Sequence, residues 1–294
     1  MTNHSKTTDD YSAQALAAFY QQQLMGTSKK IIIVEGPSDI SWIKSACVRN
    51  MYDVRDVAGK DRVLEYAMSS DNEEHACFVI DLDLDYFKNT HQHENPKIVY
   101  NCKPLTDNLH FNDIEIFQFN SPVFDAIIYD VDKYKDENFI EEIRQKLEKA
   151  SRAYGIFYVA YELLDIRLKK PSFLENFDPI SSKYFKKRTL EFNRSTFESE
   201  VDHWLSTTHR NKFQFASQVI EKAHELDKKY PQPWIFSRGH TVVSIFTEYM
   251  MCNYPSQFNA EHKYAKDDIE RLLRKIGPND IKKLPLAKFI KLKE

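Results

Sequence analysis

Two groups of carboxylates stand directly after short apolar segments of the sequence. The segment "IIIV" ends at Glu35, and "CFVI" ends at Asp81, with Asp83 and Asp85 at alternate positions beyond it. Ligands gather at the carboxyl ends of strands in a parallel sheet, and alternate residues of "DLDLD" share one face if the chain stays extended. Clustered carboxylates repel one another unless a cation neutralises them. Because oxygen donors without nearby Cys or His favour a hard ion, the pattern predicts a site for Mg2+ or Mn2+.

Each acidic group also has a purely structural interpretation. The Gly-Pro-Ser-Asp that follows Glu35 is typical of a loop and a helix start, with Ser38 as the N-cap. The segment "DLDLD" is also compatible with a solvated turn. Both groups occur in order, each after an apolar strand, and a strand and a helix separate them. This combination favours the metal site over two unrelated structural features.

The elements that must position these acids alternate between strand and helix. Apolar runs predict buried strands, the alternation of "YDVRDVAG" predicts a half-buried strand that stops at Gly59, and helical spacing of apolar residues predicts the helices between them. Alternation at this spacing indicates crossover units, so we expect an α/β fold with a mostly parallel, Rossmann-like sheet flanked by helices. The predicted strands cover 29–35, 52–59, 76–83 and 97–103, and the predicted helices cover 38–50 and 60–70.

The pattern changes to helical periodicity after about residue 135. A long helix is predicted over 137–170 with a break near Gly155, and a later helix opens with Ser195 and Glu198 in capping-box spacing. A short strand is predicted at "TLEFN". Further helices are predicted over 213–229, 240–252 and 264–275. The expected domains are an N-terminal helix over 1–27, a catalytic α/β domain over 28–135 and a mainly α-helical domain over 136–294.

Length and composition set limits on the class of protein. The chain has 294 residues, a formal net charge of −3 and four cysteines without paired spacing. The charge excludes a protein that is basic over its whole surface, although it allows local basic patches. The scattered cysteines fit reduced thiols better than a disulfide or zinc framework. With no apolar run near the roughly 20 residues of a membrane span and no signal-peptide core, the sequence predicts a cytoplasmic protein without a membrane segment.

Several cationic residues are candidates for contacting a nucleic-acid backbone. The segment "KYFKKR" forms one basic cluster, and its Tyr184 and Phe185 are candidates for stacking on bases. The C-terminal tail forms a second cluster, and the "RGH" segment offers a further phosphate contact. For each of these residues a solvated surface is the alternative. The candidates for nucleic-acid binding are Lys186, Lys187, Arg188, Arg238, His240, Lys282 and Lys283, and Lys60 is the candidate for offsetting charge on the reacting phosphate.

The two acidic groups together resemble the TOPRIM domain, the catalytic module of type IA and type II topoisomerases, bacterial-type primases and OLD-family nucleases. The shared pattern is a strand, then Glu-Gly with an acid four residues after the glutamate, and later an apolar strand that closes in Asp-x-Asp. The resemblance implies the TOPRIM fold and Mg2+ chemistry, with Asp39, Asp81 and Asp83 holding one ion. It implies that Glu35 either completes that ligand shell or acts as general base. The matching positions are Glu35, Gly36, Asp39, Asp81 and Asp83, within a region of about residues 29–120.

A longer series of motifs resembles a narrower family of stand-alone, OLD-like TOPRIM nucleases encoded beside AAA-type ATPases. The series is "VEGPSD", "AGKDRVLEY", "DLDLDYF", "NDIEIF" and "FSRGHTVVSIF". This family includes the effector nuclease of the PARIS anti-phage defence system. The resemblance implies a second metal position formed by Asp85, Asp113 and Glu115. Since the sequence contains no Gly-x-x-x-x-Gly-Lys-[ST] motif, the AAA/ABC-type ATPase would be a separate protein.

The resemblance leads us to expect a Mg2+-dependent endonuclease that cleaves RNA, with tRNA as the first candidate, as a toxin effector restrained by its ATPase partner. We expect the released protein to form a homodimer. The apolar stretches 157–164 and 234–246 are candidates for the surface that docks on the ATPase. A DNA nuclease of OLD type and a non-catalytic metal- or nucleotide-binding module are the alternatives. A topoisomerase or primase is disfavoured, because the chain is short for a gate and lacks a zinc-binding segment.

Overall fold

The computed structural model of the chain describes residues 29–48, 51–69, 76–83, 85–88, 98–100, 113–164, 173, 177–208, 213–258 and 261–291. The helix predicted over 1–27 lies outside the described residues. Within these ranges no helix is both long enough and apolar enough to cross a membrane.

The described residues form two compact units. One unit takes the described residues of 1–103 and 274–294, and the other takes those of 104–273. The chain therefore leaves the first unit once and returns to it for its last segment. The sequence-based division at residue 135 differs from this arrangement, because the periodicity of a helix does not reveal the unit with which it packs.

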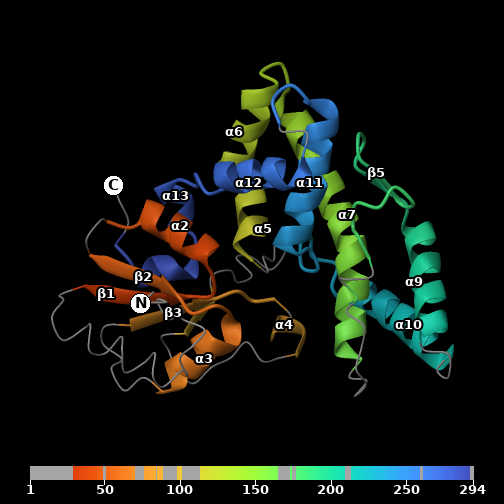
Figure 1. The fold of residues 1–294 in the computed structure, drawn as a ribbon, viewed down its shortest axis with the longest axis horizontal. Helices are drawn as coiled ribbons and strands as arrows, with labels where there is room; N and C mark the ends of the chain where they lie inside the picture. Colours follow the sequence, from red (N-terminus) through yellow and green to blue (C-terminus); the bar gives the residue numbers. More distant parts are fainter. Residues whose placement is uncertain are drawn as a thin grey trace, which may run out of the picture. The chain divides into compact units, whose positions relative to one another are not determined.

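A four-stranded parallel sheet forms the centre of the first unit (Figure 1). The strands are β1 (Lys30–Val34), β2 (Tyr52–Asp56), β3 (Ala76–Ile80) and β4 (Ile98–Tyr100), and the helices after the first three are α2 (Pro37–Ala46), α3 (Lys60–Ser69) and the short α4 (Asp85–Lys88). The strand order is β2-β1-β3-β4, and every neighbouring pair is parallel. Parallel neighbours need crossover connections, which α2 and α3 supply for β1, β2 and β3. The predicted α/β fold is confirmed.

Both faces of the sheet are covered by apolar side chains. Alternate residues of a strand point to opposite faces, and Ile31 and Ile33 of β1 pack with Val63 and Tyr66 of α3 in one buried cluster. Helix α2 packs against β1 and β2, and Figure 1 shows it on the face opposite α3. A strand buried on both faces has no polar side, which is why the central strands β1 and β3 read as continuous apolar runs, whereas the edge strand β2 keeps polar residues.

The N-cap of helix α2 lies two residues before the position that the sequence suggested. Its N-cap is Gly36, and Pro37 occupies the first helical position. Proline is favoured there because the N–H that it lacks would have no partner within the helix. The prediction of Ser38 as the N-cap is therefore wrong.

The last described segment belongs to the sheet unit. It contains α13 (Pro278–Ile281) and the 3-10 helix η3 (Pro285–Lys288), and η3 packs against β4. The carbonyl of Lys291 accepts a hydrogen bond from Val48 N at 3.1 Å, and Lys291 N donates to the Tyr52 hydroxyl at 2.6 Å. These contacts fix the end of the described chain beside α2 and β2.

The second unit is mainly helical in its described part. Its longest helix, α7 (Glu137–Leu163), packs against helices that precede and follow it in the sequence. The described helices of this unit besides α7 include α5 (Ile114–Phe119), α6 (Pro122–Val131), α9 (Arg194–Thr208), α10 (Phe213–Lys229), α11 (Gly239–Asn253) and α12 (His262–Leu273), and β5 (Phe185–Lys186) pairs antiparallel with β6 (Glu191–Phe192). The helical C-terminal half predicted from the sequence is confirmed.

Helix α7 runs through Gly155 without a break, so the predicted interruption there is wrong. A Cβ atom at this position would lie 1.9 Å from the carbonyl oxygen of Phe236. The glycine therefore permits close approach of the segment before α11, and it does not end the helix. A single glycine lowers helix propensity in the sequence, but the sequence does not show which neighbour requires it.

The start of α9 is capped by a different residue from the one predicted. The side-chain oxygen of Asn193 accepts hydrogen bonds from Thr196 N at 3.1 Å and from the Ser195 hydroxyl at 2.9 Å. Asn193 is therefore the N-cap, and the capping box predicted for Ser195 and Glu198 is wrong. Asparagine is among the preferred N-cap residues, so both candidates were compatible with the local sequence.

The apolar stretches expected to dock on a partner form part of the core of the second unit. Phe157 and Tyr161 of α7 are fully buried, as are Phe236 and Phe246 around α11. Phe246 packs edge-on against the ring of Phe119 in α5, with ring centroids 5.5 Å apart. These side chains are not available to a partner, so the prediction that they form a docking surface is wrong.

Candidate active site

Glu35 lies at the carboxyl end of β1, where it contacts the chain as it leaves β3. Its Oε1 accepts a hydrogen bond from the backbone N–H of Asp81 at 2.6 Å. Its carbonyl accepts a second one from Gly59 N at 2.8 Å, in the turn after β2. Burial raises the pKa of the Glu35 carboxyl to about 7, and the charge of Asp83 adds to this rise while the bond from Asp81 opposes it. The chain leaving β2 and the chain leaving β3 thus both contact Glu35, through its backbone carbonyl and its carboxylate respectively.

The segment "DLDLD" does not stay extended, so the predicted mechanism of convergence is wrong. Strand β3 ends at Ile80, Asp83 has a φ of 44°, and α4 begins at Asp85. Aspartate is one of the residues that tolerate this left-handed region. The carboxylates of Asp83 and Asp85 are brought together by a turn, and their common neighbour is a lysine rather than one face of a strand.

Lys60, the first residue of α3, places its ammonium group among these acids. Its Nζ lies 3.0 Å from Asp85 Oδ2 and 3.5 Å from Asp83 Oδ2. It also donates to the carbonyl of Asp81 and, at 3.4 Å, to that of Leu82. Burial would lower the pKa of Lys60, but the charges of Asp83 and Asp85 outweigh burial and raise it. The ammonium therefore stays charged and neutralises part of the acidic group.

Tyr100 belongs to this group of residues, although no motif in the sequence indicated it. It is the last residue of β4, and its hydroxyl donates to Asp85 Oδ2 at 3.0 Å. Lys60 Nζ lies 5.8 Å from the centroid of its ring. Burial, followed by the charge of Asp85, raises the pKa of the Tyr100 hydroxyl, so the phenol stays protonated and can donate. The strand was predicted to continue to residue 103, which concealed the position of Tyr100 at a strand end.

Asp39 is engaged in the start of α2. Its Oδ2 accepts from Gly36 N at 3.1 Å, and its Oδ1 accepts from Trp42 Nε1 at 3.4 Å. The side chain is buried, and burial raises the pKa of the carboxyl. These contacts match the structural interpretation of the Glu-Gly-Pro-Ser-Asp segment. A role for Asp39 as a metal ligand stays a prediction.

The side chains around Glu35 are of the type that binds a hard cation. In the structure, however, the carboxylates of Asp83 and Asp85 surround the ammonium group of Lys60. Glu35, Asp81 and Asp83 supply carboxylate oxygens, the ligands that Mg2+ prefers. Among the residues that the structure describes, no three Asp, Glu, His or Cys side chains are grouped so that they could hold a metal ion. The Lys60 ammonium already contacts Asp83 and Asp85. A divalent ion bound by Asp83 would therefore compete with this lysine.

Asp113 and Glu115 belong to the second unit, where they lie at the N-terminus of α11. Asp113 Oδ1 accepts from Ile116 N at 3.0 Å, and its Oδ2 accepts from Gly239 N at 2.5 Å. A Cβ atom at Gly239 would lie 2.7 Å from Glu115 Oε2. The positive end of the helix dipole stabilises carboxylates at this position. A hydrogen bond thus connects the motif "NDIEIF" with the motif "FSRGHTVV". The second metal position that Asp113 and Glu115 would form with Asp85 stays a prediction.

Arg238 and His240 lie on either side of that glycine. Arg238 is the N-cap of α11, and its guanidinium carbon lies 4.4 Å from the centroid of the Tyr158 ring, in a cation–π contact. His240 is exposed, and its carbonyl accepts from the Ser244 hydroxyl at 2.9 Å. Because His240 is already the second residue of α11, it does not cap the helix. Phosphate binding by either side chain stays a prediction.

The basic cluster at 183–188 is largely paired with acids. Lys186 Nζ lies 2.6 Å from Glu191 Oε2, and Lys187 Nζ lies 2.8 Å from Glu248 Oε2. Arg188 is exposed on the same hairpin. The pairing reduces the positive charge that this cluster could offer to a nucleic-acid backbone.

The aromatic residues of the same cluster are buried. Tyr184 and Phe185 are 4% and 2% exposed. The ring of Tyr184 packs edge-on against Phe197 with centroids 4.9 Å apart. The prediction that these rings stack on bases is therefore wrong.

The tail lysines lie in the unit that contains the sheet. Lys282 and Lys283 are exposed, as a solvated face or a phosphate-binding surface both require. Lys282 Nζ contacts Asn279 Oδ1 at 3.3 Å, and Lys283 Nζ lies 2.9 Å from Asp280 Oδ1. These local contacts do not decide between the two interpretations.

No protein-family model matches this sequence, and no curated protein is significantly similar to it. The function must therefore be inferred from the residues of this chain and from their arrangement.

Proposed function

We propose that the sheet unit is a TOPRIM-type, Mg2+-dependent endonuclease centre that hydrolyses phosphodiester bonds of nucleic acid. The observation that carries this proposal is the meeting of Glu35 with the N–H of Asp81 at the carboxyl ends of two adjacent parallel strands. Ligands gather at this edge of a parallel sheet. The order of the motifs along the chain, Glu-Gly followed by Asp-x-Asp, supports the same class of site.

The residues at this edge of the sheet would each have a separate role in hydrolysis. Asp39, Asp81 and Asp83 would hold a Mg2+ ion, which supplies a water of lowered pKa and stabilises negative charge on the phosphate. Glu35, fixed by its hydrogen bond from Asp81 N, would complete that shell or remove a proton from the attacking water. Lys60 would offset the charge that develops on the phosphate oxygens. Its three N–H donors allow it to keep one carboxylate contact while it meets the substrate.

The motif series supports a particular biological setting for this chemistry. It resembles AriB, the effector nuclease of the PARIS anti-phage system, which a separate AAA/ABC-type ATPase holds in check. On this basis the substrate is RNA, with tRNA as the first candidate, and the released protein is a toxin that pairs with a second copy of itself. Expression of the chain alone should then arrest growth, while co-expression with the ATPase should yield an inert complex.

The experiment that tests the proposed chemistry compares two glutamate variants. Purified wild type, Glu35→Gln and Glu65→Gln are incubated with total RNA and with plasmid DNA, in Mg2+, in Mn2+ and in EDTA. Glu65 lies exposed on α3 of the same unit, so its variant has the same change of charge away from the strand ends. We expect Glu35→Gln to lose at least about 100-fold in cleavage rate, the usual effect of removing a general acid or base.

Each outcome of this comparison has a definite meaning. Metal-dependent cleavage by wild type and Glu65→Gln, lost in Glu35→Gln and in EDTA, supports the proposal. Equal cleavage by Glu35→Gln and wild type contradicts it. Absence of cleavage by wild-type protein freed of partners favours a non-catalytic, metal-binding module.

A further inference from the structure

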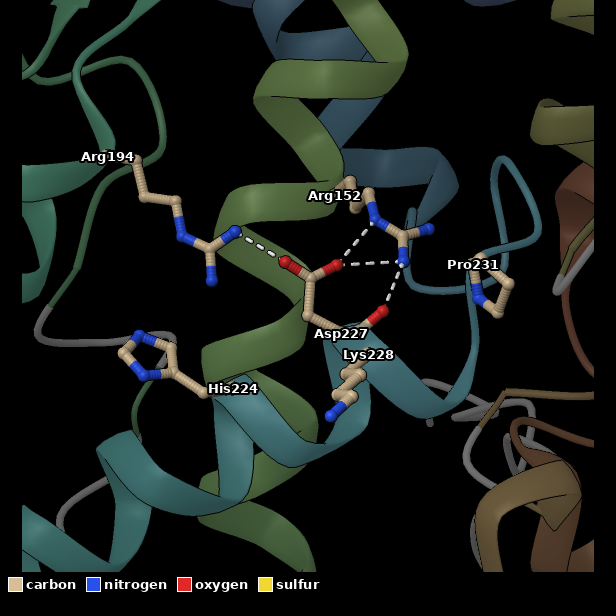
Figure 2. A pocket seen from close by; sticks show the side chains of 6 residues that line it. All are labelled: Arg152, Arg194, His224, Asp227, Lys228 and Pro231. Carbon is tan, nitrogen blue, oxygen red and sulfur yellow. Dashed lines mark hydrogen bonds and ion pairs between the residues drawn. The ribbon is translucent and has the colours of Figure 1, made fainter.

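A charged pocket in the second unit shares no residue with the candidate active site. Its volume is about 480 Å3, within the range of roughly 300–1,000 Å3 that is typical of small-molecule sites. Three helices, α7, α9 and α10, supply its walls (Figure 2). The residues that line it are Arg152, Arg194, His224, Asp227, Lys228 and Pro231. Two of these side chains, Arg152 and Arg194, pair with the Asp227 carboxylate, and Lys228 adds a third basic group to the lining.

Asp227 holds two guanidinium groups in fixed positions. Arg152 donates through Nε and Nη2 to Asp227 Oδ1 at 3.0 and 2.9 Å, and Arg194 donates through Nη1 to Oδ2 at 2.5 Å. Figure 2 shows the carboxylate between the two guanidinium groups. Burial would raise the pKa of Asp227, but its hydrogen bonds with Arg194 and Arg152 outweigh burial and hold the pKa below its ordinary value. One carboxylate thus holds two guanidinium groups in place.

Arg152 is the anchored member of this pair. Its Nη1 donates to the carbonyl of Gln232 at 2.8 Å, and its Nη2 donates to the carbonyl of Tyr230 at 2.5 Å. Its side chain is 15% exposed. Most of its donors are therefore used within the protein, and its role is to position Asp227 and, through it, Arg194.

Arg194 and Lys228 retain donors that the protein does not use. Arg194 donates through Nε to Glu198 at 2.8 Å and through Nη1 to Asp227, and its Nη2 has no hydrogen-bond partner among the described residues. Lys228 forms no ion pair within the described part of the chain. A guanidinium edge and an ammonium group are the side-chain groups that bind phosphate best.

Glu198 and Glu148, which lie next to the pocket, neutralise part of the positive charge of Arg194 and Arg152. Glu198 accepts from Arg194 and lies 3.2 Å from His224 Nε2, and Glu148 lies 3.7 Å from Arg152. A network of ion pairs that only stabilises the fold is therefore the competing explanation. It accounts for Arg152 and for two of the nitrogens of Arg194. It gives no role to Lys228, and it leaves an open pocket beside the Nη2 group of Arg194.

We propose that this pocket binds a phosphate group, held by Arg194 and Lys228, with Arg152 and Asp227 fixing the orientation of Arg194. The phosphate is either a free or terminal phosphate or a phosphodiester of a nucleic-acid backbone, since both present the same anionic oxygens. Preorganised guanidinium groups lower the entropy cost of binding. The proposal goes beyond the nuclease function and depends on no residue of the sheet unit.

The test measures two ligands in EDTA, so that cleavage does not interfere. Inorganic phosphate is titrated by calorimetry, and a fluorescent RNA is titrated by anisotropy over a series of salt concentrations. The variants are Lys228→Gln, Arg194→Gln and, as control, Lys222→Gln, which makes the same change of charge elsewhere on α10. Circular dichroism checks the fold, and Lys228→Gln keeps the test valid if Arg194→Gln unfolds, because no ion pair is lost with Lys228.

Two results would support the pocket and would identify the source of the phosphate. If phosphate is free or terminal, wild type and Lys222→Gln bind inorganic phosphate saturably and Lys228→Gln binds it at least about fivefold more weakly, as expected for loss of one partly exposed charged contact. If the phosphate belongs to a nucleic-acid backbone, Lys228→Gln weakens RNA binding, and the slope of log binding constant against log salt concentration falls in magnitude by about one. Inorganic phosphate then binds weakly to wild type. If both pocket variants match Lys222→Gln with both ligands, the cluster is an ion-pair network and the proposal is overturned.

Discussion

Replacing Gly155 with alanine would test the close approach between α7 and the segment that precedes α11. In an exposed helix the change would stabilise the protein by about 1 kcal/mol, because alanine has the higher helix propensity. Here the new Cβ would lie 1.9 Å from the carbonyl oxygen of Phe236 and 2.9 Å from its carbonyl carbon. Non-bonded atoms of this kind pack at about 3.5–4.0 Å. Since the neighbour is backbone, no change of rotamer can relieve the contact.

The size of the effect follows from what must move. Relief requires α7 and the backbone at Phe236 to separate by roughly 1.5 Å, the difference between the built contact and ordinary packing. Both sides of the contact are buried, with Tyr154 and Ile156 flanking the glycine and Ile235 preceding the phenylalanine. Overpacking a core costs about 1–3 kcal/mol, and movement of backbone belongs at the upper end. After the helix-propensity gain of about 1 kcal/mol, a net loss of about 2 kcal/mol remains.

Urea denaturation followed by far-UV circular dichroism would measure this loss, and calorimetry should show a Tm lower by about 4–8 °C for a unit of this size. Lys149→Ala serves as the control, because Lys149 is exposed on the same helix. Its stability should change by less than about 0.5 kcal/mol. If Gly155→Ala were as stable as wild type or more stable, the close approach to Phe236 would be refuted and Gly155 would be an ordinary helix glycine.

Three further predictions concern charge. Mg2+ should raise the Tm by mass action, and Asp81→Asn with Asp83→Asn should abolish the rise in calorimetry; an undiminished rise would locate the ion elsewhere. Lys60→Met should reduce RNA cleavage on gels by about 100-fold or more, because a charge-stabilising donor is lost; a wild-type rate would exclude Lys60 from the chemistry. The lowered pKa of Asp227 means that its ion pairs stabilise the fold above the unfolded pKa of about 3.9 and that this contribution is lost as the pH falls through the lower folded value. Asp227→Asn should therefore be less stable than wild type to urea at neutral pH, with the difference shrinking in strong acid, and a pH-independent difference would contradict this origin.

The two central strands of the sheet, β1 and β3, could be predicted because each is buried on both faces. "KIIIV" and "ACFVI" carry no polar face that would confuse the pattern, and both strands appear where they were expected. The positions of the helix caps were less secure, because Gly36 and Asn193 compete locally with serines that are equally good caps. The place of residues 274–291 could not be predicted at all, since their contacts with β4 and Tyr52 depend on chain more than 180 residues away.

In the candidate site, too, features that depend on one segment of the sequence could be predicted, and contacts between distant segments could not. The sequence pointed to Glu35 and Asp81 at strand ends, and the structure brings these two residues into contact. It did not predict the turn at Asp83, which needs a left-handed backbone, or the pairing of Lys60 with Asp85. Such contacts join residues from different strands and helices, and a pattern read along one segment carries no information about them.

The return of residues 274–291 to the sheet unit has a consequence for biosynthesis. A ribosome delivers the chain from the N-terminus at about 5–20 residues per second, so the strands and their acids emerge first. The packing of η3 on β4 and the hydrogen bond from Lys291 to Tyr52 can form only after the whole helical unit has been made. The sheet unit is therefore completed only after the helical unit has been synthesised. A binding partner that recognises the helices could attach during this interval, before the unit that carries Glu35 has its final contacts.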